Sequence, residues 1–147
     1  MSVRTLLNNQ DKQIWSVEPD ASVYEAIRLM ADRDTGAVLV MQESALVGIF
    51  TERDYARKVI LHGKLSKDLK VRDVMTSSLI TVTPQHTISE CISLMTKHHI
   101  RHLPVVASGT VVGLISVRDV MRSIVGDQDE AIKRLESFAM GEESDLI

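Results

Sequence analysis

Aromatic side chains are scarce in this sequence, at 3% of its 147 residues. The core must therefore be built from aliphatic side chains, and we do not expect a surface of aromatic rings on which nucleic-acid bases could stack. A net charge of -3 and an isoelectric point of about 5.9 give no electrostatic reason to expect binding to nucleic acid or to an anionic membrane. The composition predicts neither partner.

Cysteine occurs only once, as Cys91, which excludes an internal disulfide framework and fits a reducing compartment. No apolar run approaches the roughly 20 residues that a membrane-spanning helix needs. The N-terminal segment MSVRTLLNNQ becomes polar too soon for a signal peptide. We therefore expect a cytoplasmic protein.

What the chain does contain is an internal repeat. Residues 14–60 align with residues 79–125 at a constant offset of 65 and without a gap, and 12 of the 47 aligned positions are identical. The identical pairs are Val17/Val82, Pro19/Pro84, Glu25/Glu90, Ile27/Ile92, Leu29/Leu94, Met30/Met95, Val40/Val105, Val47/Val112, Gly48/Gly113, Arg53/Arg118, Asp54/Asp119 and Arg57/Arg122. The chain is therefore a tandem duplication.

Each copy predicts the same five elements. A short apolar strand, IWSV or LITV, ends at Pro19 or Pro84 because proline cannot donate to a continuing ladder. SVYE and TISE then carry the S/T-x-x-E pattern of a capping box, and apolar residues at helical spacing follow. Two apolar runs separated by turn residues predict a hairpin, and a second helix starts at Thr51 or Ser116. The predicted hairpin strands are Ala37–Met41 with Leu46–Phe50, and His102–Val106 with Val111–Ile115.

We therefore expect an α+β fold of two tandem β-α-β-β-α repeats packed about a pseudo-twofold axis. Each repeat would form a small three-stranded sheet with helices on one face. The expected divisions are residues 1–62 for the first repeat with its lead-in and residues 63–126 for the second repeat with its linker. Residues 127–147 would form a C-terminal helix and tail.

The segments outside the repeats carry two further patterns. VRTLL (Val3–Leu7) before the first repeat is echoed by VRDVM (Val71–Met75) before the second. Ile132, Leu135 and Ala139 recur at helical spacing, which predicts a helix that docks on the body and ends at Gly141. We expect the EESDLI tail to be frayed.

The second helix of each copy starts in a repeated motif, GIFTERD (Gly48–Asp54) or GLISVRD (Gly113–Asp119). Thr51 and Ser116, each followed three residues later by an acid, form a helix N-cap that needs no ligand. The arginine before each acid opposes the positive end of the helix dipole unless an anion is bound there. A hydroxyl, free N–H groups and a guanidinium at a helix start also make a phosphate site, and an aspartate can accept ribose hydroxyls. The motif fits both a cap and a binding site.

The chain resembles a pair of CBS domains, also called a Bateman module. The resemblance rests on VRDVMTSSLITVTP, HHIRHLPVV and GLISVRD in the second copy and on SVEPDASVYEAIRLM and VGIFTERD in the first, and it covers about Val3 to Val125. It implies a stand-alone, non-catalytic regulatory module that forms a homodimer and regulates an unidentified protein. It also implies an adenosyl ligand, namely AMP, ADP, ATP, NAD or S-adenosylmethionine, in the cleft between the repeats.

The same resemblance implies which residues contact the ligand. In the motif, the hydroxyl residues and the arginines contact phosphate, and the aspartates contact the ribose hydroxyls. These residues are Thr51, Arg53 and Asp54 in the first copy and Ser116, Arg118 and Asp119 in the second. The segment before the second strand and the end of the first strand supply the remaining predicted contacts, which are Gly36, Ala37, Val38, Arg101, His102, Leu103, Glu18 and Thr83.

The two copies differ outside the motif, so one occupied site per chain is as compatible with the sequence as two. The Asp54 copy is slightly favoured for a charged ligand because its site would borrow Thr83 from the other copy. A purely structural dimerisation module, whose motifs only cap helices, stays open as the alternative function. An enzyme has no support, because the sequence holds no Walker-type glycine loop and no positioned nucleophile and base.

Two other candidate sites are set aside. HHIRH places His98, His99 and His102 close together, but the predicted helix ends between them and no cysteine accompanies them, so we do not expect a zinc site. Cys91 falls on the apolar stripe of its helix, which is typical of a core residue rather than a nucleophile.

Overall fold

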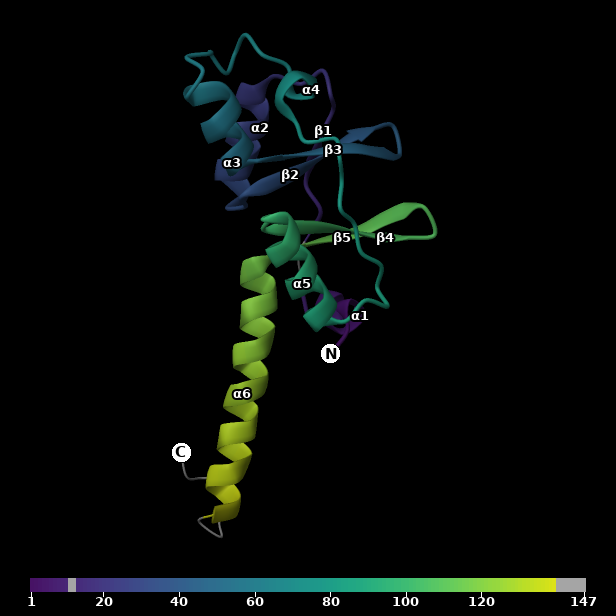
Figure 1. Ribbon diagram of the computed structural model, residues 1–147, viewed down its shortest axis with the longest axis vertical. Coiled ribbons are helices and arrows are strands. Elements are labelled where there is room, and N and C mark those ends of the chain that lie inside the picture. The colour runs from purple at the N-terminus through teal and green to yellow at the C-terminus, as the bar shows by residue number, and fades with distance from the viewer. Residues whose placement is uncertain (11–12, 140–147) are drawn as a thin grey trace.

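The structure is a computed structural model that describes residues 1–10 and 13–139. Two units of similar build stack on one another, and a long helix extends from the second (Figure 1). The elements in chain order are α1 (Val3–Asn8), β1 (Ser16–Val17), α2 (Val23–Arg33), β2 (Ala37–Gln42), β3 (Ala45–Thr51), α3 (Glu52–Tyr55), the π-helical turn η1 (Ala56–Ile60), α4 (Val71–Val74), α5 (Ile88–His98), β4 (His102–Ala107), β5 (Thr110–Ser116) and α6 (Val117–Ala139).

The first unit contains the predicted three-stranded sheet in the order β1-β2-β3. β1 pairs parallel to β2, and β2 and β3 form an antiparallel hairpin with a bulge between Val40 and Met41. The hairpin forms where two apolar runs flank a turn of polar residues, and Glu43 in that turn adopts a left-handed φ of 57°. The hydroxyl of Ser22 caps α2 by accepting a hydrogen bond from the Glu25 N–H at 3.1 Å, as the S-x-x-E pattern predicts.

The second unit repeats this plan, except that its first strand is reduced to one residue. β4 and β5 form the antiparallel hairpin. Val82 pairs with Val105 only as an isolated parallel bridge, in which the Val106 N–H donates to the Val82 carbonyl at 2.8 Å. Among the described residues the second sheet therefore has two strands and a bridge instead of the predicted three strands. Pro84, two residues after Val82, cannot donate to a continuing ladder, and Pro19 holds the same position after β1 in the first unit.

The lead-in segments cross over between the units. α1 lies before the first unit in the sequence, but Val3 and Leu6 are buried in the core of the second, with Val82 and Leu103. α4 lies before the second unit, but it packs in the core of the first. The core of the first unit comprises Val23, Ala26, Met30, Val38, Val40, Phe50, Val59, Val71 and Val74. Each unit is thus completed by a segment that precedes the other.

A third apolar cluster joins the two sheets. Leu39 and Ile49 of the first sheet are buried against Val111 and Leu114 of the second. Ile49 and Leu114 occupy equivalent positions in the two copies, so equivalent surfaces face each other, as the expected pseudo-twofold packing requires. The helices cover the outer face of each sheet (Figure 1). This arrangement brings both repeated motifs to the boundary between the units.

The prediction of a separate docking helix after residue 126 is wrong. α6 is one continuous helix of 23 residues, about 34 Å long at 1.5 Å per residue, and its C-terminal part projects away from the body (Figure 1). Leu135, predicted to dock, is 68% exposed. The single Gly126 is too weak a breaker to end a helix that has good helix formers on both sides. The predicted end at Gly141 and the tail lie outside the described residues. None of the described helices is both long enough and apolar enough to cross a membrane.

Candidate functional site

The motif of the second unit lies where β5 ends and α6 begins. The Ser116 hydroxyl accepts a hydrogen bond from the Asp119 N–H at 3.1 Å, and Asp119 Oδ2 accepts one from the Ser116 N–H at 2.9 Å. These reciprocal bonds are the predicted N-cap, and they hold the Asp119 carboxylate at the first turn of the helix. Asp119 also takes part in a further interaction and is 8% exposed.

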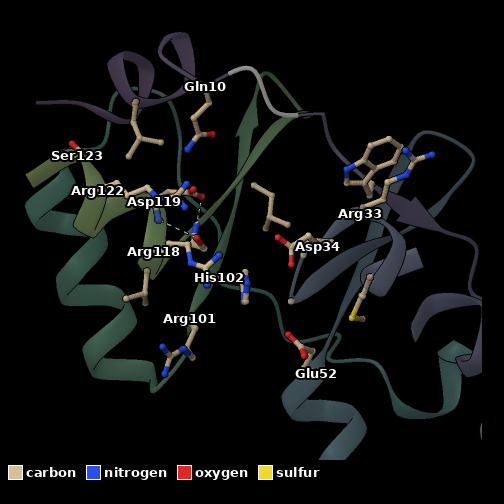
Figure 2. Close-up of a pocket in the computed structure, with 18 of the residues that line it drawn as sticks. Gln10, Arg33, Asp34, Glu52, Arg101, His102, Arg118, Asp119, Arg122 and Ser123 are labelled. Atoms are coloured by element: carbon tan, nitrogen blue, oxygen red, sulfur yellow. Dashed lines mark hydrogen bonds between the residues drawn. The ribbon is translucent and has the colours of Figure 1, made fainter. Parts of the chain in front are cut away.

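A cavity of about 1260 Å³ opens beside this motif, between the two units. Figure 2 shows Asp119, Arg118 and His102 lining it from the second unit, with Asp34 and Glu52 facing them from the first. The predicted site residues that line it are Gly36, Arg101, His102, Ser116, Arg118 and Asp119. The structure therefore brings together the predicted contacts of the second copy with one from the first.

The cavity wall carries charges of both signs from both units, but most of its cations lie on the second. Arg101, Arg118 and Arg122 come from the second unit with Asp119, whereas the first unit supplies Arg33 with Asp34 and Glu52 (Figure 2). Within the described part of the chain, none of the three guanidinium groups of the second unit is hydrogen-bonded or ion-paired to another side chain. The wall of the second unit can therefore attract an anionic group.

Several lining residues were missed by the sequence analysis. Trp15 and Arg33 line the cavity together, and the Arg33 guanidinium lies 4.2 Å from the centre of the indole ring. Ser123 and the N-terminal Met1 contribute from α6 and from the start of the chain. Arg122 also lines the cavity, and its alignment with Arg57 was the one hint of it in the sequence. Trp15, Arg33, Ser123 and Met1 lie on segments whose packing no local pattern reveals.

The motif of the first unit has the same cap but different surroundings. The Thr51 hydroxyl accepts from the Asp54 N–H at 3.0 Å, and Asp54 Oδ2 accepts from the Thr51 N–H at 3.1 Å. The other carboxylate oxygen, Oδ1, accepts from the Thr76 hydroxyl at 3.1 Å and lies 3.2 Å from the Lys58 ammonium. Thr51 and Asp54 are not among the residues that line the 1260 Å³ cavity. The sequence favoured this copy slightly, whereas the cavity lies at the other.

The two motif arginines also differ. Arg118 lines the cavity, whereas Arg53 reaches across to the second unit and donates to the His99 carbonyl at 2.9 Å. His99 ends α5 in a left-handed conformation, so Arg53 meets the negative end of that helix dipole. The His99 carbonyl of the same chain thus offsets the unfavourable position of Arg53 at its own helix start, and no anion is needed there.

Comparisons with known proteins agree with this fold of two repeated units. The model of the CBS domain family matches twice, over residues 10–61 and 71–126. The chain belongs to the CBS domain family. A protein with CBS domains from Burkholderia ambifaria has the same fold with a TM-score of 0.85, at 41% identity over 87% of this chain and 96% of that one.

Relatives by sequence include two CBS domain-containing proteins. The mitochondrial CBS domain-containing protein CBSX3 of Arabidopsis thaliana is 40% identical over 87% of this chain, which spans 64% of the relative's length. The CBS domain-containing protein YhcV of Bacillus subtilis is 31% identical over 74% of this chain and 76% of its own length. The structure of a CBS-domain containing protein from Agrobacterium tumefaciens matches with a TM-score of 0.80 at 31% identity, covering 84% of this chain and 98% of that one.

The remaining ligand contacts carried over from CBS proteins lie away from the cavity. Ala37, Val38 and Leu103 are buried, so their side chains belong to the cores of the CBS pair. Glu18 is exposed and does not line the cavity. The Thr83 hydroxyl is engaged with His86 Nδ1 at 3.1 Å in a local turn and does not line it either.

The glycines that open the CBS motifs admit the lead-in segments. A Cβ on Gly48 would lie 2.6 Å from Met75 Sδ, and one on Gly113 would lie 2.6 Å from Leu7 Cδ2. A glycine in a strand permits the close approach of another group, and here the lead-in segments approach. Leu7 and Met75 occupy equivalent places in VRTLL and VRDVM, so both lead-ins dock in the same way.

The histidine and cysteine residues of the CBS pair do not form a metal site among the described residues, where no three His, Cys, Asp or Glu side chains gather suitably. Cys91 is buried in the second core. Burial, with a smaller contribution from the Glu90 carboxylate, raises the pKa of the Cys91 thiol to about 11. A thiol with so high a pKa is a poor nucleophile at neutral pH.

Proposed function

We propose that this CBS pair is a regulatory module that binds one adenine nucleotide, AMP, ADP, ATP or NAD, in the cavity beside Asp119. The observation that carries the proposal is the coincidence of the cavity with the second motif. A space of about 1260 Å³ meets a capped carboxylate and three arginines at the place where the family resemblance puts a ligand. Ordinary ligand pockets occupy roughly 300–1,000 Å³, so the space is sufficient for a dinucleotide.

The arginines supply the phosphate contacts in this proposal. The Val117 N–H donates to the Arg101 carbonyl at 3.0 Å, and the Asp119 N–H donates to Ser116. Two of the first amides of α6 are therefore already used. Guanidinium groups bind phosphate through paired, charge-assisted hydrogen bonds, so Arg101, Arg118 and Arg122 replace the helix amides in that role.

The carboxylate and the apolar lining account for the nucleoside. A carboxylate can accept both hydroxyls of a ribose, and Asp119 is held at the cavity edge by its cap. Leu114 and Val117 line the same wall and offer apolar surface to a base. Gly36 and His102 lie at the segments that the resemblance assigns to adenine.

A more distant protein supports the ligand class. The crystal structure of the CBS domain pair of protein MJ0100 is a complex with 5′-methylthioadenosine and S-adenosyl-L-methionine. That chain is 24% identical, with a TM-score of 0.75 over 86% of this one, so the likeness concerns the fold. It supports an adenosyl ligand as a class, and titration must decide between nucleotides.

The wider biology of the module is also part of the proposal. We expect a non-catalytic homodimer that changes the activity of a partner protein when the nucleotide binds. With a net charge of -3, nucleic acid is not an expected partner. The single cysteine fits a reducing compartment, and a cytoplasmic location is part of the proposal, although the Arabidopsis relative bears a mitochondrial name.

Isothermal titration with AMP, ATP and NAD tests the proposal. We expect saturable binding of at least one of them with one site per chain, and no binding of inorganic phosphate at the same concentrations. Thr83→Ala serves as a control, because Thr83 does not line the cavity, and should bind as the wild type does. Wild-type protein that binds none of the three nucleotides at millimolar concentration would refute the proposal.

A structural dimerisation module is the second candidate. Its support is that both motifs complete their caps with protein atoms alone. Met121 and Val125 on α6 are also more than half exposed, at 59% and 51%, and could be covered by another chain. This candidate predicts a dimer whose melting temperature is the same with and without nucleotide.

A further inference from the structure

The two motif helices carry the same residues at three positions and differ at the residue one turn after the motif aspartate. Arg53, Asp54 and Arg57 in the first copy align with arginine, aspartate and arginine in the second. Lys58 aligns with Ser123. A long cation therefore stands in one copy where a short neutral side chain stands in the other.

Lys58 bridges the space between the motif helix and the lead-in segment of the first unit. Its ammonium lies 3.2 Å from Asp54 Oδ1 and donates to the Val74 carbonyl at 3.1 Å. Val74 is the last residue of α4, so the lysine connects the motif helix to the lead-in segment that packs beside it. The Thr76 hydroxyl, on the same segment, donates to the same carboxylate oxygen. The Asp54 side chain is only 11% exposed as a result.

The equivalent gap in the second unit is open. Ser123 and Leu6, the counterparts of Lys58 and Val74, both line the 1260 Å³ cavity. Figure 2 shows Ser123 at its edge, near Arg122 and Asp119. The Ser123 hydroxyl contacts the Met1 sulfur at 2.7 Å, whereas Lys58 contacts the Val74 carbonyl of α4.

The docking of the lead-ins does not account for this difference. In both copies a Cβ added to the motif glycine would lie 2.6 Å from the lead-in, from Met75 Sδ at Gly48 and from Leu7 Cδ2 at Gly113. The helix backbone does differ, because Lys58 lies in the π-helical turn η1, in which the Leu61 N–H donates to the Ala56 carbonyl at 3.2 Å. Ser123 lies in the regular helix α6. π-helical turns are rare and frequently occur at functional positions.

We infer that Lys58 is a specificity-determining residue that occupies, in the first unit, the space that the ligand takes in the second. Its ammonium neutralises Asp54 and bridges to Val74, so a ribose would have to displace a charge-assisted hydrogen bond to bind there. Each chain therefore holds one nucleotide although its sequence carries two motifs. This inference rests on the proposed function for the identity of the ligand.

Titration with AMP in an Asp119→Ala background tests the inference. Asp119→Ala alone should bind AMP at least tenfold more weakly than the wild type does. Asp119→Ala with Lys58→Ser should regain one site per chain, with a Kd within about tenfold of the wild-type value. A tenfold change in Kd is what the loss of one charge-assisted hydrogen bond would cause. Adding Asp54→Ala to that double variant should abolish binding again.

Two controls make the outcome specific. Lys58→Arg in the same background keeps the cation and should not restore AMP binding. Lys58→Met removes the charge at similar length and should restore at least weak AMP binding. Circular dichroism melting of every variant establishes that it is folded. A folded Asp119→Ala, Lys58→Ser variant that binds no AMP, or a single Lys58→Ser variant that loses the wild-type site, overturns the inference.

A ligand-free measurement separates this inference from the proposed function. The crystal structure of Lys58→Ser should contain a cleft beside Asp54 lined by Thr51, Arg57 and Val74. If Thr76 or α4 moves in and fills that space, Lys58 is not what closes the first unit. Wild-type protein that binds none of AMP, ATP and NAD counts against the proposed function, and the Lys58→Ser structure still decides the role of Lys58.

Discussion

The two halves of the molecule carry the same motif and the same helix cap, but they present different surroundings to it. Asp119 adjoins a large cavity, whereas Asp54 is enclosed by Lys58 and Thr76. Duplication has kept the residues that start the helix and changed the residue one turn later. The comparison teaches that the hydroxyl, arginine and aspartate of the motif do not by themselves define a binding site. Under the proposed function, the open space beside Asp119 distinguishes the second copy from the first.

The largest effect expected from this comparison is on nucleotide affinity. Asp119→Ala should weaken AMP binding by at least tenfold, because hydrogen bonds to a charged group contribute about 1.5–3 kcal/mol. Asp54→Ala should change AMP affinity by less than twofold, although it leaves Lys58 without its carboxylate. Isothermal titration of both variants below their melting temperatures measures the contrast. Equal losses in the two variants would show that both copies bind.

The second effect is on stability and compares the motif glycines. A methyl group at Gly48 would lie 3.0 Å from the Thr76 carbonyl oxygen, which is held by the backbone pairing of Thr76 with Ile49. A methyl group at Gly113 would meet only the end of the Leu7 side chain at less than 3.4 Å, and that side chain can rotate. Gly48→Ala should therefore lower the unfolding free energy by about 1–3 kcal/mol, and Gly113→Ala by clearly less.

Urea unfolding of the two glycine variants provides this measurement. Gly63→Ala is unsuitable as a control because Gly63 has a positive φ of 67°. Gly126→Ala is suitable, since nothing lies within 4 Å of its added Cβ, and it should be neutral or slightly stabilising. A Gly113→Ala variant as unstable as Gly48→Ala would mean that the two lead-ins are held equally rigidly.

The third effect compares the two caps. The Thr51 hydroxyl both accepts from the Asp54 N–H and donates to Asp54 Oδ2, whereas the Ser116 hydroxyl accepts from the Asp119 N–H. Thr51→Ala should cost about 1–2 kcal/mol of stability without changing AMP affinity. Ser116→Ala should cost about 0.5–1 kcal/mol and also weaken AMP binding several-fold. Chemical unfolding and titration of both variants test the pair, and an affinity loss confined to Thr51→Ala would reverse the assignment.

The smallest effect concerns the capping boxes of α2 and α5. Glu90 accepts from the Thr87 N–H at 2.9 Å, and this backbone hydrogen bond lowers the pKa of its carboxyl group below the ordinary 4.5. The stabilisation is therefore present above pH 4.5 and is lost as the pH falls through the lower pKa of the folded state. Glu90→Gln should melt below the wild type at pH 7, and the gap should close under acid conditions.

Glu25 is the matched position in the first copy. Its N–H donates to Ser22, but the described structure contains no return bond from the Glu25 carboxylate to the cap. Glu25→Gln should therefore melt close to the wild type at both pH values. Thermal melts at pH 7 and pH 3 measure the difference, and an equal loss in the two variants would show that both boxes are closed in solution.

Much of the fold could be predicted because short local patterns in the sequence determine it. The offset of 65 aligns the two units, the apolar runs separated by turn residues predict both hairpins, and S/T-x-x-E marks the starts of α2 and α5. The short range of these interactions is the reason, since caps and turns depend on residues within a few positions of one another. The family resemblance of the motif also pointed to the cavity wall at Ser116 and Asp119.

The parts that could not be predicted depend on contacts between distant segments. No pattern in VRTLL indicates that Val3 and Leu6 complete the core of the second unit. The spacing of apolar residues after Gly126 predicts a helix, but it does not reveal whether a partner covers the apolar face. The alignment exposes the difference between Lys58 and Ser123, whereas its consequence depends on the Val74 carbonyl, whose position only the structure supplies.

A crystal structure of the wild-type protein grown with AMP tests the central claim most directly. The account predicts one nucleotide per chain, with its ribose beside Asp119, its phosphate among Arg101, Arg118 and Arg122, and Lys58 still bound to Asp54. A nucleotide beside Asp54 with the Lys58 ammonium displaced would contradict the claim.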